Sequence, residues 1–286
     1  MVSILIVNWN TCDLLDACLE SIRRFPGPQT PEVIVVDNAS TDGSAEMVRT
    51  KYTEVRLIEA GGNTGYAHGN NLAVAAAQGD YLLTLNPDTE LYEDTLDEAV
   101  EAMGRHPKAG ALGARQIFTD GSTQHSVRGF PSFWGIVGDV TGLGKLFPAS
   151  ALGSYRLGSF DYDREQDAPQ PMGTFLMFRA EAIRRANTPV PATFDESFPI
   201  FFNEVDLLYR LRQAGWNAIY SPKVRILHHG GEGTKQRRKE MIWESHRSLV
   251  RYFQKHHPSP FLPFLKLLIL AGAFVRAKGV YAGFRP

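Results

Sequence analysis

The fold is decided by two apolar runs near the start of the chain, VSILIVNWN at residues 2–10 and VIVVDNAS at residues 33–40. Each run is long enough for one buried strand and ends in polar residues. Apolar side chains recur between the two runs at helical spacing: Leu14, Leu15, Cys18, Leu19 and Ile22. A strand, a helix and a second buried strand are typical of a βαβ unit with parallel strands. The sequence therefore predicts an α/β protein.

The same alternation continues along the chain. It predicts further strands over 55–58, 81–85, 109–117, 174–179, 217–220 and 224–228, and helices over 65–78, 94–106, 181–186, 203–214, 235–256 and 261–280. Residues 119–170 lack periodicity and are expected to form long loops with short helices, including an acceptor-side or lid segment. We expect a Rossmann-like, mostly parallel central sheet flanked by helices, with a C-terminal helical extension.

Composition excludes several classes of protein. With 286 residues and 43% hydrophobic residues, the chain can bury a large core, so it is not expected to be disordered. Its two cysteines, Cys12 and Cys18, lie in one expected helix and suit neither a disulfide framework nor a zinc cluster. A reducing, cytoplasmic location is expected. The apolar run after Met1 has no basic region before it and is interpreted as a strand rather than a signal peptide.

Charge divides the chain into two unequal parts. Residues 235–286 carry 11 Lys or Arg against two Glu, a net charge of +9, which leaves 19 basic and 29 acidic residues and a net charge of −10 in the rest. Such a tail is typical of contact with an anionic partner, either nucleic acid or a membrane face. Residues 261–275 are apolar but include Lys266, and they fall short of the ~20 residues of a spanning helix.

The tail is therefore predicted to be an interfacial anchor on an anionic membrane surface, peripheral on the inner face of the cell membrane. Two alternatives remain for the same segment. One is a terminal helix that closes the core, and the other is a homodimer interface. Nucleic acid is not an expected partner, because the acidic residues discussed below need a different explanation.

Polar residues follow four successive apolar strands, at Asn8, 37–42, Asn63 and 86–88. The ligand of an open α/β sheet lies beyond the carboxyl ends of its strands, so these residues are expected to line one crevice. Asp, Asn and Gly are also ordinary turn formers, which is the structural alternative for any one cluster. Four such clusters in order favour a binding site.

These segments, together with NTGYAHGNN at residues 63–71 and LNPDT at residues 85–89, resemble family 2 glycosyltransferases with the GT-A fold. The resemblance is greatest to the rhamnosyltransferase-like branch and covers roughly residues 2–255. It implies a glycosyltransferase domain over 1–234, with a nucleotide-sugar-binding half over 1–118 and an acceptor-binding, catalytic-base half over 119–234. Residues 235–286 form the basic amphipathic tail.

By this resemblance, Asp37 accepts hydrogen bonds from the base or ribose of the nucleotide. Asp42 is either part of the same site or a helix cap. Gly65 lets the backbone approach the nucleotide sugar or serves only as a turn. The donor site implied by the resemblance is completed by Val7, Asn8, Asn10, Asn38, Asn63, Asn70, Asn86, Asp88 and Gly173.

The resemblance also places a divalent metal, Mn²⁺ or Mg²⁺, at Asn86-Pro87-Asp88, where the family usually has two aspartates separated by one residue. If the strand continues through this segment, positions 86 and 88 point the same way. Asp88 is then the metal ligand, and Asn86 contacts sugar or phosphate. His228 is the histidine expected to reach the metal or the diphosphate, with a structural role as the alternative.

The segment from Phe194 to Leu207 resembles the family's catalytic-base block. Glu204 occupies the position of the general base. Asp206, the second residue assigned to the catalytic site, is a helix-start or hydrogen-bonding residue, or the base itself if the register is shifted by two residues. In an inverting transfer, one carboxylate takes the proton of the acceptor hydroxyl while the metal holds the diphosphate leaving group. An acid favoured by the first turn of a helix is the structural alternative for Glu204.

The predicted function is an inverting, metal-dependent glycosyltransferase of cell-surface polysaccharide or glycolipid synthesis. Its donor is a dTDP- or UDP-sugar, with rhamnose the first candidate by resemblance, and its acceptor is a saccharide or a lipid-linked saccharide. A sugar-phosphate nucleotidyltransferase is one alternative, but it would have a basic glycine-rich loop after the first strand. A nonenzymatic sugar-binding or nucleotide-binding protein is the other, and it would not explain Asp37, Asp88 and Glu204 together.

Overall fold

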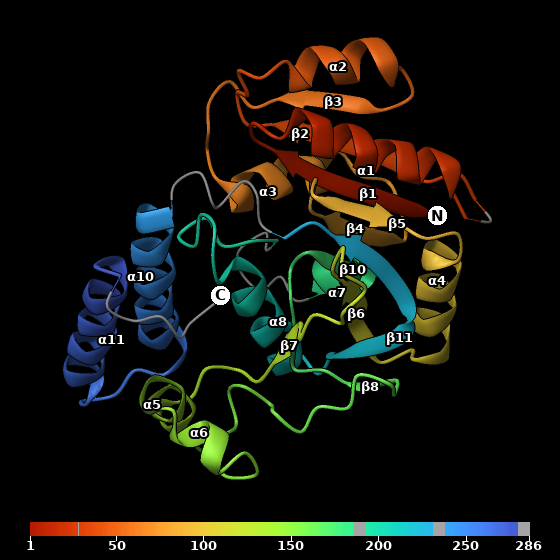
Figure 1. The fold of residues 1–286 in the computed structure, drawn as a ribbon. Helices are drawn as coiled ribbons and strands as arrows, with labels where there is room; N and C mark the ends of the chain where they lie inside the picture. The colour runs from red at the N-terminus through yellow and green to blue at the C-terminus, as the bar shows by residue number, and fades with distance from the viewer. Residues whose placement is uncertain (28, 186–192, 231–237, 280–286) are drawn as a thin grey trace.

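Figure 1 shows the fold in a computed structural model, which describes residues 1–27, 29–185, 193–230 and 238–279. The first half contains β1 (Val2–Asn8), α1 (Cys12–Arg24), β2 (Glu32–Asp37), α2 (Ser44–Lys51), β3 (Arg56–Glu59), α3 (Tyr66–Ala76), β4 (Tyr81–Leu85), β5 (Thr89–Leu91), α4 (Thr95–Arg105) and β6 (Ala109–Ile117). The second half contains β7 (Val127–Arg128), α5 (Phe133–Thr141), α6 (Leu143–Leu146), β8 (Gln166–Asp167), β9 (Gln170–Pro171), β10 (Phe175–Arg179), α7 (Ala180–Arg185), α8 (Asn203–Gln213), β11 (Asn217–His228), α10 (Arg238–His256) and α11 (Leu262–Ala277).

The central sheet has the strand order β3-β2-β1-β4-β10-β6-β11-β5, with β8 added beside β11. Strands β1 to β4 are parallel, and so are β6 and β11. The predicted α/β architecture with a mostly parallel sheet is confirmed. Strand β10 lies antiparallel between β4 and β6, so it joins the two parallel groups.

Two buried clusters cover the two faces of the sheet. On one face Ile4 and Ile6 of β1 pack with residues of α1, α2 and α4. On the other face Leu5 and Val7 pack with residues of α3, α7 and α8. Alternate residues of one strand point to opposite faces, so a fully apolar strand such as β1 is suited to a sheet that is covered on both sides.

Two expectations about strands need correction. Residues 217–228 form one strand rather than two, because Pro222 lies in a bulge and not in a turn. Ser221 pairs with Ala114 and Arg225 with Arg115, so the register against β6 shifts across this bulge. Strand β4 ends at Leu85, and residues 86–88 form a turn into β5. Strand alternation therefore does not set the relative directions of Asn86 and Asp88.

Helices α10 and α11 lie side by side at one end of the molecule (Figure 1). Val250 and Phe253 of α10 pack with Leu265 and Ile269 of α11 and with Ile136 of α5. The expected helix start at Lys235 and helix end at Val280 lie outside the described residues. Among the helices that the structure describes, none is long and apolar enough to cross a membrane.

Candidate active site

Strands β1 and β2 bring Asn8 and Asp37 together at the carboxyl edge of the sheet, where the two residues are paired in register. Asn8 Nδ2 donates to Asp37 Oδ1 at 3.1 Å, and the Ser40 amide donates to Asp37 Oδ2 at 2.9 Å. Asp37 is 3% exposed and Asn8 is fully buried. The carboxylate is thus held in one orientation, and its remaining lone pairs can accept further hydrogen bonds.

Asn10 joins the loop after β1 to the loop after β2. Its backbone has φ of 53°, a conformation that Asn adopts more readily than most residues. Asn10 Oδ1 accepts a hydrogen bond from the Thr41 amide at 2.8 Å, and the Asn10 amide donates to Ser40 Oγ at 3.0 Å. Asp42 accepts from the amides of Cys12 and Ser44 at the starts of α1 and α2, which is the capping role.

The loop that enters α3 contains several of the expected donor-site residues. Asn38 Nδ2 donates to the Gly65 carbonyl at 3.2 Å, and Asn63 Oδ1 accepts from the Gly65 amide at 3.3 Å. Gly65 has φ of 91°, and a Cβ there would lie 2.8 Å from the Pro199 carbonyl oxygen. The glycine is therefore required by a turn and by a close approach to the segment before α8.

Val7 and Asn70 lie beneath this loop. The methyl groups of Val7 press against Gly69, where a Cβ would come within 2.8 Å of Val7 Cγ1. Asn70 is fully buried and donates from Nδ2 to the Tyr66 carbonyl at 2.9 Å. Its Oδ1 has no hydrogen-bond partner within the described part of the chain. Val7 thus packs under α3, while Asn70 has an acceptor oxygen left over.

Asp88 and His228 meet across β5 and β11, with His228 Nε2 3.4 Å from Asp88 Oδ2. Both side chains are only 6% exposed. His228 Nδ1 lies 2.7 Å from Gln124 Oε1, and since an amide oxygen can only accept, Nδ1 carries the proton. In the neutral ring Nε2 then presents a lone pair. Among the described residues, this nitrogen has no hydrogen-bond partner.

A buried lone pair that faces a carboxylate fits a cation bound between them, because imidazole and carboxylate are both ligands for Mn²⁺. Asp88 and His228 are the two side chains of this site that fit a bound cation. Nowhere in the described ranges do three His, Cys, Asp or Glu residues group as a metal site. Asn86 lies two residues before Asp88, and its backbone N–H donates to the Thr174 carbonyl at 3.0 Å. Any remaining ligands would be water or diphosphate oxygens, as hard divalent cations commonly have.

Glu204 lies at the start of α8 and faces Gly173. A Cβ at Gly173 would be 3.4 Å from Glu204 Cγ, so the glycine leaves room beside this carboxylate. Burial of the Glu204 carboxyl group removes water from it and disfavours the charged form. This raises the pKa of Glu204 from 4.5 to about 7. A carboxyl group with this pKa is matched to general-base catalysis near neutral pH.

Tyr66 is close enough to both Glu204 and Asp88 for their charges to act on its hydroxyl, and the sequence did not single it out. Its hydroxyl lies 3.5 Å from the Gly173 carbonyl oxygen. Burial is the main cause that raises the pKa of Tyr66, and the charges of Glu204 and Asp88 add to it. Gln124, which orients His228, was also missed, because it lies in a segment without periodicity. The position of Tyr66 inside the 63–71 segment was the only available signal for either residue.

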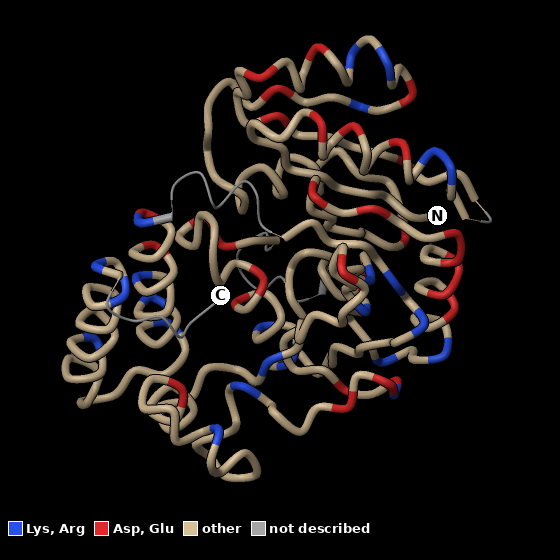
Figure 2. The backbone as a smooth tube through the Cα atoms, viewed as in Figure 1, with Lys and Arg blue, Asp and Glu red and all other residues tan. Residues whose placement is uncertain are grey.

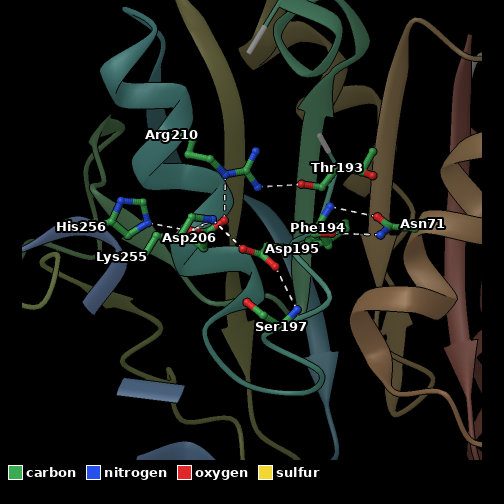
Figure 3. A network of polar contacts seen from close by, with 9 residues as sticks. All are labelled: Asn71, Thr193, Phe194, Asp195, Ser197, Asp206, Arg210, Lys255 and His256. Atoms are coloured by element: carbon green, nitrogen blue, oxygen red, sulfur yellow. Dashed lines mark hydrogen bonds and ion pairs between the residues drawn. The ribbon is translucent and has the colours of Figure 1, made fainter. Parts of the chain in front are cut away.

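Asp206 has a different environment from Glu204, although the two share the first turn of α8. It is fully buried and forms ion pairs with Arg210, Lys255 and His256 at 2.7 to 2.8 Å. Figure 3 shows these side chains converging on Asp206, with Asp195 also paired to Lys255. Against the effect of burial, these partners hold the pKa of Asp206 at about 2. The structure therefore places Asp206 in a network that ties α8 to α10.

Comparison with known proteins identifies the family of this chain. The model of the family "Glycosyl transferase family 2" matches residues 3–185. N-acetylglucosaminyl-diphospho-decaprenol L-rhamnosyltransferase of Mycobacterium tuberculosis is 29% identical over 237 residues, which cover 79% of this chain and 75% of that protein. Rhamnosyltransferase WbbL of Escherichia coli K12 is 27% identical over 241 residues, which cover 80% and 83% respectively.

Solved structures show the same fold. The mannosyltransferase PcManGT of Pyrobaculum calidifontis, in complex with GDP-Man and Mn²⁺, matches 100% of this chain and 76% of that one, with a TM-score of 0.61 and 21% identity. At this identity the likeness extends to the GT-A fold alone. These findings do not favour a nucleotidyltransferase or a nonenzymatic binding protein. The family match covers more than half of the chain, and the protein therefore belongs to glycosyl transferase family 2.

Proposed function

We propose that this protein transfers a sugar, with inversion, from a nucleoside diphosphate sugar to an acceptor hydroxyl. Rhamnose from dTDP-rhamnose is the first candidate donor, because two relatives carry rhamnosyltransferase names. UDP-hexoses are the alternative. The observation that carries the proposal is the placement of Glu204 beside Gly173, with its pKa raised to about 7, where its charge and that of Asp88 in the buried Asp88–His228 pair both act on the Tyr66 hydroxyl.

Different residues of the site would bind the nucleotide, accept the proton and hold the cation. Asp37 holds the nucleotide by accepting its hydrogen bonds at the end of β2. Glu204 takes the proton of the acceptor hydroxyl, and Gly173 leaves space for that hydroxyl to reach the carboxylate. Asp88 and His228 would hold Mn²⁺ or Mg²⁺. When bound, the cation would neutralise the charge that develops on the diphosphate leaving group.

A lipid-linked saccharide is the proposed acceptor, because the name of the M. tuberculosis relative includes a diphospho-decaprenol. The proposed place of the reaction is an anionic membrane surface on the cytoplasmic side, and exposed apolar residues of α11 support the contact with a membrane. Helix α11 leaves large apolar side chains exposed, among them Phe264 at 57% and Leu267 at 67%, while Leu265 and Ile269 face α10. Lys266 stands between the exposed residues. An apolar face with interspersed cations is typical of an interfacial helix.

The donor test is a thermal-shift panel of dTDP-, UDP- and GDP-sugars with and without Mn²⁺. A donor that binds the folded protein raises the melting temperature, and we expect the increase to be largest with Mn²⁺ and dTDP-rhamnose. Transfer to a lipid-linked saccharide, with the anomeric configuration of the product read by NMR, then tests inversion. Equal responses to all nucleotide sugars, with or without metal, would contradict the proposal.

The membrane test uses the exposed face of α11. Phe264→Asp combined with Leu267→Asp removes apolar surface that the fold does not bury, so the melting temperature should not change. We expect at least a tenfold loss of sedimentation with phosphatidylglycerol vesicles, and little binding of either protein to phosphatidylcholine. A change from dimer to monomer with unchanged vesicle binding would instead identify this face as a homodimer interface.

A further inference from the structure

Helices α10 and α11 enclose a groove of about 350 Å³ that the proposed chemistry does not use. Its lining combines cationic and apolar side chains: Trp243, Arg247, Val250 and Arg251 of α10 with Lys266 and Leu270 of α11. No acidic residue of the described chain lines it. Figure 2 shows basic residues along both helices on this side of the molecule.

Two of the three cationic side chains that line the groove form no ion pair with a described residue. Arg251 is paired with Glu244, its Nη1 lying 2.6 Å from Glu244 Oε1. Arg247 and Lys266 are exposed, and neither has an ion pair with any residue that the structure describes. Two unbalanced cations on facing helices match the charge of a diphosphate diester, which is a dianion.

Helix α11 also has exposed apolar residues next to Lys266 in the chain. Phe264, Leu267 and Leu268 of α11 are exposed on either side of Lys266. Charged groups above such a surface are typical of a protein that holds a lipid headgroup while the lipid tail stays in the membrane. A free phosphate would need the cations but not the apolar residues beside them.

One side of the groove leads toward the active site. A second cavity of about 510 Å³ shares Trp243 and Arg247 with the groove and extends to Pro199 and Ile200. The Pro199 carbonyl accepts a hydrogen bond from the Ala67 amide at 3.1 Å, at the start of α3 beside the donor loop. This cavity also contains Glu240 and Glu244, and an aromatic ring with carboxylates offers the stacking and hydrogen-bonding groups that a saccharide needs.

We propose that the α10–α11 groove binds the diphosphate of a lipid-linked acceptor. Arg247 and Lys266 contact the diphosphate, the lipid leaves along the exposed face of α11, and the saccharide extends through the larger cavity toward Glu204. This inference rests on the proposed function, because it assigns a binding site to the acceptor of that reaction. It gives the basic tail a specific ligand rather than a general attraction to anionic surfaces.

The test measures binding without any donor, so it does not depend on catalysis. Geranylgeranyl diphosphate is titrated by calorimetry into the wild-type protein, into Arg247→Ala combined with Lys266→Ala, and into Lys108→Ala as a matched control. Lys108 is an exposed cation before β6, outside the groove. We expect at least a tenfold weaker affinity in the double variant and no change in the control. Geranylgeraniol and inorganic pyrophosphate should each bind at least tenfold more weakly than the complete probe.

Several results would overturn the site. One is equal affinity of the wild-type protein and the double variant for geranylgeranyl diphosphate. Another is weaker binding of the double variant to phosphatidylglycerol vesicles with unchanged affinity for the diphosphate, which would indicate a membrane contact only. In the transfer assay, the double variant should raise the KM for the lipid-linked acceptor at least tenfold and leave the donor KM unchanged. If the wild-type protein binds the diphosphate but transfers no sugar, the proposed reaction fails while the site stands.

Discussion

Replacing Glu204 with Gln tests the mechanism most directly. The amide keeps the shape of the side chain but cannot take the proton of the acceptor hydroxyl. Transfer should fall by the ~10² to 10⁴ that is typical of losing a general base, while the dissociation constant of the donor changes little. In the wild-type protein, the rate should rise with pH up to about 7 and level off above it, because the base must be ionised.

The same substitution has a predicted effect on stability. The pKa of Glu204 is about 7 in the folded protein against an ordinary value of 4.5, and each pKa unit corresponds to about 1.4 kcal/mol. The folded state therefore binds this proton more tightly than the unfolded state. Folding stability falls as pH rises from 4.5 to about 7, by at most roughly 3–4 kcal/mol. Below pH 4.5 the carboxyl group is protonated in both states and contributes no such loss.

The amide of the Glu204→Gln variant cannot ionise, so the variant should gain stability relative to the wild-type protein as pH rises. We expect the difference in unfolding free energy between variant and wild type to be larger at about pH 8 than at about pH 5, measured by urea denaturation without ligands. Glu196→Gln is the control. Glu196 is an exposed carboxylate before α8, and it accepts a hydrogen bond from the side-chain amide of Asn71. Near-normal turnover of the Glu204 variant, or an equal effect of the control, would refute the reasoning.

The remaining predictions concern the other residues of the site. Asp88→Ala should abolish the effect of Mn²⁺ on donor binding and leave the melting temperature unchanged, and unaltered affinity in Mn²⁺ would contradict the metal assignment. Asp206→Asn should cost roughly 3–5 kcal/mol in urea unfolding, since it removes the buried carboxylate that pairs with Arg210 and His256. With its pKa near 2, Asp206 should also make the wild-type protein lose stability as pH falls from 3.8 toward 2. Gly65→Ala should weaken donor binding, because φ of 91° and Pro199 both oppose a Cβ; unchanged affinity would exclude this constraint.

The sequence predicted the parallel half of the fold well because its signals are local. Strands β1, β2 and β4 are largely apolar runs that end in polar or turn residues, and helical spacing marks α1 between the first two. The position of β10 could not be predicted in the same way. Its antiparallel pairing joins Phe175 to Leu85 and Leu176 to Gly113. Such contacts depend on packing between segments far apart in the chain, and periodicity does not record them.

The candidate site was predictable where residue type and strand ends coincide. Asn8, Asp37 and Asp88 were expected at one edge of the sheet, and the structure places Asn8 and Asp37 at the ends of β1 and β2 and Asp88 in the turn after β4. The contacts that give them orientation come from distant segments. Gln124 orients His228 from a segment without a pattern, and Pro199 approaches Gly65 from the other half of the chain. The roles of these residues follow from tertiary contacts, so sequence reasoning had no signal for them.

Glu204 and Asp206 show why residue type alone does not assign a catalytic role. They are two residues apart on α8, yet one turn of helix directs them into different surroundings. Glu204 faces Gly173 with no cation to stabilise its charge among the residues described, whereas Asp206 lies among Arg210, Lys255 and His256. Their pKa values are therefore driven apart, to about 7 and about 2. A general base works best when its pKa lies near the working pH, which favours Glu204 over Asp206 for the proposed role. The ion-paired Asp206 anchors α10, the helix that carries Trp243 and Arg247 of the proposed acceptor site.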